Sequence, residues 1–92
     1  MKLVYKSSEN ITVADLDQLA VTYSGVVNIG RKCKEVWNTI AIEDETIDPF
    51  QCNYQRTPEV QTMLNGKPLG KWGEVINPGD TISFGEVTIS VL

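Results

Sequence analysis

The strongest constraint on the fold lies near the C-terminus, where apolar and polar residues alternate and the alternation changes phase once. The apolar residues are Ile82 and Phe84 before the change and Val87, Ile89 and Val91 after it. A two-residue turn at Gly85-Glu86 explains the change, because it pairs Phe84 with Val87 and places these side chains on one face. Glycine at the first turn position favours a type II′ turn. The segment predicts an antiparallel hairpin.

Two further turns are predicted upstream of this hairpin. Asn65-Gly66 stands between short apolar runs and is the strongest two-residue hairpin signal, because both central positions favour positive φ. The segment 77–80, Asn-Pro-Gly-Asp, fits a type II turn in which proline fixes φ and glycine takes the left-handed position. The C-terminal third is therefore expected to be β structure joined by tight turns.

Shorter patterns predict the remaining elements. Strands are expected over residues 2–6, 26–29, 37–42 and 50–55. A short helix is expected over 12–20, with Thr12 as its cap, Asp15 in its first turn, and Val13 on its apolar face. We thus predict a single mainly β (α+β) domain over residues 1–92. Its expected form is a small antiparallel β-sandwich or barrel-like domain with one short N-terminal helix.

The residue types present argue against catalysis. The chain has no histidine, which removes the commonest general base near neutral pH and the commonest zinc ligand. Its two cysteines, Cys33 and Cys52, lack metal-ligand spacing and are interpreted as small buried hydrophobic residues. The sequence contains no phosphate-binding glycine motif. We therefore predict no enzyme activity, no catalytic residues, no metal and no cofactor.

Charge and hydropathy narrow the class of partner. The formal net charge is −4, which disfavours direct binding to nucleic acid. An acidic protein is steered toward basic surfaces, so we expect a protein partner that is either a basic protein or a nucleoprotein complex. No apolar segment is long enough for a signal peptide or a membrane span, so we expect a cytoplasmic protein without membrane contact. The oligomeric state is left open.

An acidic cluster and a basic cluster are the candidate binding segments. The acidic cluster consists of Glu43, Asp44, Glu45 and Asp48. It is either a solvated loop or a patch that meets Lys or Arg on a partner, and it lacks the framework of a calcium loop. The basic cluster consists of Arg31, Lys32 and Lys34, which either stay solvated or meet a phosphate or an acidic partner.

The two tryptophans receive different interpretations. Trp37 adjoins a predicted strand and is expected in the core. Trp72 lies between Gly70-Lys71 and Gly73, where it is either an interface anchor or a core residue. Trp72 is therefore kept with Arg31 and the acidic cluster as a candidate contact residue.

From residue 26 onward the order of features resembles a forkhead-associated (FHA) domain. The resemblance rests on the segments 29–31 (Ile-Gly-Arg), 38–44 (Asn-Thr-Ile-Ala-Ile-Glu-Asp), 65–69 (Asn-Gly-Lys-Pro-Leu) and 78–85 (Pro-Gly-Asp-Thr-Ile-Ser-Phe-Gly). It implies a β-sandwich of a family that binds phosphothreonine peptides. The early helix with the closing turns is similar, as a second choice, to small β-grasp proteins, but the chain lacks the terminal Gly-Gly of their sulfur carriers.

The positions that the FHA resemblance assigns to phosphate binding are largely changed. Where the family has Ser-x-x-His, this chain has Asp48-Pro49-Phe50-Gln51, and a carboxylate at the serine position repels phosphate. The family's Asn-Gly-Thr segment is missing, and Arg31 alone carries over. Our leading hypothesis is a non-enzymatic protein-binding module without a functional phosphothreonine pocket. The alternative is a small phage or mobile-element inhibitor, for example an anti-defence protein, that binds a basic nucleic-acid-binding complex by acidic mimicry.

Overall fold

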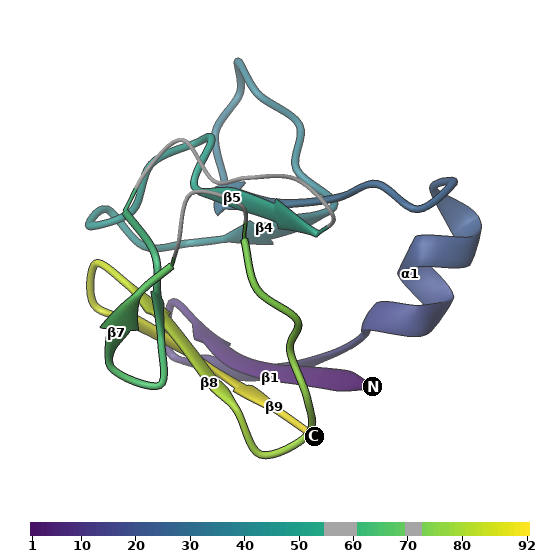
Figure 1. The fold of residues 1–92 in the computed structure, drawn as a ribbon. Helices are drawn as coiled ribbons and strands as arrows, with labels where there is room; N and C mark the ends of the chain where they lie inside the picture. The colour runs from purple at the N-terminus through teal and green to yellow at the C-terminus, as the bar shows by residue number, and fades with distance from the viewer. Residues whose placement is uncertain (55–60, 70–72) are drawn as a thin grey trace.

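The computed structural model describes residues 1–54, 61–69 and 73–92, and the candidate contact residue Trp72 lies outside them. The described strands form two layers (Figure 1). One is a six-stranded antiparallel sheet in the order β2-β1-β9-β8-β6-β7, and the other is a three-stranded sheet in the order β4-β3-β5. The larger sheet comprises β1 (Lys2–Ser7), β2 (Asn10–Asp15), β6 (Met63–Leu64), β7 (Lys67–Pro68), β8 (Thr81–Phe84) and β9 (Val87–Val91).

The predicted C-terminal hairpin is confirmed. Strands β8 and β9 pair in the expected register, with Phe84 opposite Val87 and Ile82 opposite Ile89. Gly85 has a φ of 55°, as the first position of a type II′ turn requires. The apolar side chains of this hairpin therefore face the other layer and form one side of the core.

The other two predicted turns are confirmed as well. Asn65 and Gly66 both have positive φ, 51° and 80°, and they join β6 to β7. In the turn at 77–80, Gly79 has a φ of 100° and the Asp80 N–H donates to the Asn77 carbonyl at 3.0 Å. The Asp80 carboxylate then links the turns, accepting from Asn65 Nδ2 at 3.0 Å and from Asn77 N at 2.7 Å.

The prediction of a helix over residues 12–20 is wrong in its first half. Residues 10–15 form β2, which pairs with β1 along its whole length, and the helix α1 spans Leu16–Thr22. The N-cap is Asp15, whose carboxylate accepts from Gln18 N at 3.1 Å, and Thr12 lies within the strand. The pairing with β1 is a tertiary contact that overrides the local helical pattern, because every residue from 10 to 15 has a partner in β1 and Ala14 packs against the core.

The smaller sheet is formed by β3 (Val27–Arg31), β4 (Ile40–Ile42) and β5 (Cys52–Tyr54), and all three fall within or beside predicted strands. Strand β3 pairs with β4 in parallel and with β5 in antiparallel orientation, so this layer is mixed. A parallel pair needs a connection that leads the chain back to the same end, and residues 32–39 supply it.

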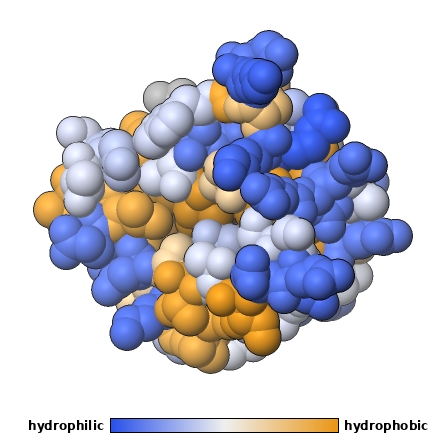
Figure 2. Space-filling model, turned by 180° about the vertical axis from the view of Figure 1, so that it is seen from behind, coloured by the Kyte–Doolittle hydropathy of each residue, from blue (hydrophilic) through white to orange (hydrophobic). Residues whose placement is uncertain are grey.

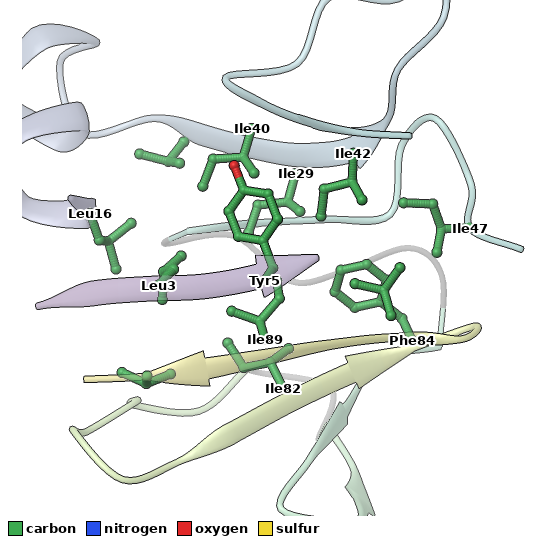
Figure 3. Close-up of a cluster of buried hydrophobic side chains, with 13 residues drawn as sticks. Leu3, Tyr5, Leu16, Ile29, Ile40, Ile42, Ile47, Ile82, Phe84 and Ile89 are labelled. Atoms are coloured by element: carbon green, nitrogen blue, oxygen red, sulfur yellow. The ribbon is translucent and has the colours of Figure 1, made fainter. Parts of the chain in front are cut away.

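The core lies between the two layers and is built from one face of each (Figure 3). Its fully or nearly fully buried residues include Leu3, Leu16, Ile42, Ile89, Val27 and Val91. The prediction of Trp37 as a core residue is wrong, because β4 begins only at Ile40 and the indole is 65% exposed. Cys33 and Cys52 are partly buried, and Cys52 packs against the core as an apolar side chain does.

Candidate functional site

The acidic segment, which we define as residues 43–51, lies at one end of the sandwich and is fixed by both sheets. Ser8 N donates to the Glu43 carbonyl at 3.1 Å, and Glu43 N donates to Ser7 Oγ at 2.9 Å. On the other side, Glu86 N donates to Thr46 Oγ1 at 2.8 Å. The β1–β2 and β8–β9 turns therefore hold this loop in place.

The end of β3 packs directly against the same segment. Arg31 N donates to the Asp48 carbonyl at 3.1 Å, and Asn38 Nδ2 donates to the Pro49 carbonyl at 2.8 Å. A Cβ atom on Gly30 would lie 2.1 Å from that Pro49 oxygen and 2.7 Å from Asn38 Nδ2. Residue 30 must therefore be glycine for the loop to approach this closely. The predicted site residues Arg31 and Asp48 are brought together by this contact.

Two of the predicted acidic residues stabilise the loop itself. Asp44 Oδ1 accepts from both the N–H and the hydroxyl of Thr46, and Asp48 Oδ1 accepts from Phe50 N at 2.8 Å. These are Asx-type turns, in which a short carboxylate replaces a backbone acceptor. The cluster is therefore partly explained by local structure, and its role toward a partner stays a prediction.

The remaining acidic side chains point into solvent. Glu43 Oε1 lies 3.1 Å from Lys32 Nζ, and both side chains are more than half exposed. A pair this exposed contributes little to stability. Glu45 is also exposed. The charge of Lys32 therefore partly balances the negative charge of this segment.

Gln51 is a buried residue of this segment whose structural role the sequence did not reveal. Its side chain is 2% exposed, and its Oε1 accepts from Asp48 N at 3.2 Å. Its Nε2 donates to the Gln61 carbonyl at 3.0 Å and to Thr62 Oγ1 at 3.3 Å. The side chain uses its donor and acceptor groups together, so it locks the backbone of residue 48. Only the FHA resemblance, which places histidine here, had marked this position.

The Arg31 side chain carries a polar atom that the fold does not satisfy. Its Nε is buried and has no hydrogen-bond partner among residues 1–54, 61–69 and 73–92. The residue as a whole is only half-buried, so part of it reaches the surface beside Asp48. A surface that places a cation next to carboxylates can complement a partner surface that also carries both charges.

Sequence reasoning also missed an aromatic pair on the surface. The rings of Tyr23 and Trp37 lie 5.4 Å apart between centroids at an interplanar angle of 51°. They are 40% and 65% exposed, so they form a contact on the surface between the end of α1 and the 32–39 connection. The only signal in the sequence was the lysine-rich setting of Trp37, which is unusual for a core residue.

The described part of the chain was searched for metal-ligand clusters and for membrane-spanning helices. No group of three or more His, Cys, Asp or Glu side chains there is arranged to hold a metal ion. Within the same residues, no helix has the length and apolarity that crossing a bilayer demands.

Comparison with known proteins supports the fold. No family model and no curated protein matches the sequence. Among solved structures, the chain is similar to the solution structure of the FHA domain of an Arabidopsis thaliana hypothetical protein, with a TM-score of 0.62 and 18% sequence identity. The match covers 99% of this chain and 86% of the other. The fold predicted from the resemblance is therefore confirmed as FHA-like, whereas an identity this low says nothing of function.

Proposed function

We propose that this chain is a non-enzymatic protein-binding module that uses the FHA-like fold without a phosphothreonine pocket. The FHA-like fold supports a binding role, because FHA domains are typically non-catalytic binding modules. The net charge of −4 favours a partner with a basic surface, and we propose the cytoplasm as the place of the encounter. Fold likeness is an analogy, so the site itself must carry the argument.

The observation that carries the proposal is Asp48. This residue stands where the resemblance implies a serine, and its backbone is fixed at both ends by Arg31 N and by Gln51 Oε1. Its carboxylate is exposed and accepts from Phe50 N at 2.8 Å. A phosphate approaching Arg31 would meet this negative charge where a hydroxyl donor would be required.

The backbone that carries this carboxylate cannot easily shift. Gln51 is buried and joins the Asp48 backbone to residues 61 and 62, so shifting residue 48 would break a hydrogen-bonded unit in the interior. Leaving such buried groups unpaired costs about 1–3 kcal/mol each. The backbone of residue 48 is therefore held next to that of residue 31 by the fold itself.

Titration with paired peptides tests the proposal. The wild-type chain is expected to bind phosphorylated and unphosphorylated threonine peptides equally weakly, measured by fluorescence anisotropy of labelled peptides. Asp48→Ser should raise the preference for the phosphorylated peptide by about tenfold or more, since it removes a like charge and adds a donor. Glu45→Ser is the matched control, because it removes an exposed charge from the same loop. A clear phosphate preference of the wild-type protein would refute the proposal.

A further inference from the structure

Strand β2 is the outer strand of the six-stranded sheet, and β1 is its only strand neighbour among the described residues. Lys2 exchanges backbone hydrogen bonds with Leu92, at 2.9 and 2.8 Å, so the backbone of Lys2 points toward β9. Hydrogen-bonding direction alternates along a strand, so Leu3 and Tyr5 point toward β2 and bond to the even-numbered residues Ala14 and Thr12. The odd-numbered residues of β2 then direct their N–H and C=O groups to the open edge.

The same odd-numbered residues carry the exposed apolar side chains. Ile11 is 76% exposed and Val13 is 58% exposed, whereas Ala14 packs against the core. Val13 stands opposite Val4 of β1, so its outward face continues onto the next strand. From behind, hydrophobic side chains gather at the lower edge of the molecule, at the height of the six-stranded sheet in Figure 1 (Figure 2). The open edge thus offers backbone groups and apolar contacts together.

Natural edge strands are normally protected, and β2 is not. Between Asn10 and Asp15 there is no lysine, no proline and no bulge, since each residue has one partner in β1. The strand is also anchored at both ends. The turn before it bonds to Glu43 through Ser8 N, and after it Leu16 N donates to the Met1 carbonyl at 3.0 Å. A preformed strand loses little entropy when another strand pairs with it.

We propose that β2 binds an extended segment of a partner protein, which adds to the sheet as an antiparallel strand. This inference rests on the proposed function and names its partner surface. The segment carries apolar side chains opposite Ile11 and Val13, and Lys or Arg opposite Glu9 and Asp15, the exposed acidic residues that flank them. A strand is the only occupant that satisfies a row of backbone donors and acceptors at this spacing.

Charge favours a basic partner segment over a second copy of this chain. If Ile11 of one copy stood opposite Val13 of another, Glu9 would stand opposite Asp15 of that second copy. Like charges directly opposite each other destabilise a strand pair, and each copy adds a net charge of −4. A basic segment turns both flanking contacts into opposite-charge pairs.

The test titrates the full chain with a synthetic peptide with blocked ends, Lys-Thr-Val-Thr-Ile-Thr-Lys, and monitors binding by NMR. The amides of residues 10–14 are expected to shift, and a peptide with glutamate in place of both lysines should bind about tenfold more weakly. Val13→Pro removes a donor at the open edge and no bond to β1, and it should weaken binding about tenfold. Ile11→Lys should act similarly. Val21→Lys is the matched control, because Val21 is 79% exposed on α1. The peptide affinity of this variant should stay within twofold of that of the wild-type chain.

Three results would overturn the inference. The first is the absence of shifts in the amides of residues 10–14, and the second is a peptide affinity of Val13→Pro equal to that of the wild-type chain. The third is a dimer in sedimentation that Ile11→Lys abolishes, which would make a second copy the occupant. The phosphopeptide titration measures binding at the surface around Arg31 and Asp48 and does not involve β2. Failure of the edge to bind is therefore distinguishable from failure of the proposed function.

Discussion

Replacing Gly30 by alanine tests whether the contact between β3 and the 43–51 segment is as close as the structure shows. The added methyl group would lie 2.1 Å from the Pro49 carbonyl oxygen. Favourable contacts of carbon begin at about 3.5 Å, so one of the two segments must move by more than about 1 Å. That movement would break the bond from Asn38 to Pro49 and weaken the bond from Arg31 to Asp48.

The expected magnitude follows from these losses. Overpacking costs about 1–3 kcal/mol, and two hydrogen bonds contribute about 1 kcal/mol each, so Gly30→Ala should destabilise the fold by about 3–5 kcal/mol. A chain of 92 residues is stable by about 5–14 kcal/mol, so this loss is a large part of the total stability. With a urea slope of about 2 kcal/mol per molar, the midpoint should fall by about 2 M.

Urea unfolding followed by circular dichroism measures this change, and Gly66→Ala is its control. Gly66 has a φ of 80° and nothing within 4 Å of an added Cβ, so its cost is conformational alone, about 1–2 kcal/mol. A midpoint shift for Gly30→Ala no larger than that for Gly66→Ala would refute the close contact. It would also remove the structural reason for placing Arg31 beside Asp48.

Two further predictions concern titratable groups. Hydrogen bonds from Asn65 and then from Asn77 lower the pKa of Asp80, so its stabilisation is present above about pH 4 and is lost as the pH falls through the lowered value. The urea midpoint of the wild-type chain should therefore fall more between pH 5 and pH 2.5 than that of Asp80→Asn; parallel curves would contradict this. Burial raises the pKa of Cys52 to about 12, so this thiol stays neutral at pH 8. With an aromatic disulfide reagent, native Cys33→Ser should show no fast reaction, whereas native Cys52→Ser should react readily; fast reaction of Cys33→Ser would be the contrary result.

The turns could be predicted from the sequence because each depends on two to four adjacent residues. Gly85, Gly79 and the pair Asn65-Gly66 adopt the positive φ values that their turn types require, whatever packs around them. The register of β8 with β9 followed from the same local rule. The pairing of the central strands could not be derived, because β3 contacts β4 and β5 through connections whose length leaves several arrangements open.

The sequence indicated candidate site residues but not the contacts that the structure gives them. The FHA resemblance placed Arg31 and Asp48 in the same neighbourhood, and the backbone bond between them agrees with that. The buried side chain of Gln51 was invisible to sequence reasoning, because an amide in a loop is usually exposed. Trp37 was misplaced for the opposite reason, since a large aromatic residue usually signals the core.

The error at residues 10–15 has the largest consequence for function. Val13 and Leu16 share a helical face, but the same stretch also alternates, with Thr12 and Ala14 on one side and Ile11 and Val13 on the other. Local pattern could not decide between these readings, whereas pairing with β1 decides for the strand. Interpreted as a helix, Val13 belongs to the core and needs no partner. Interpreted as an edge strand, the same residue has an open backbone and an exposed side chain, which is why the partner surface became visible only with the fold.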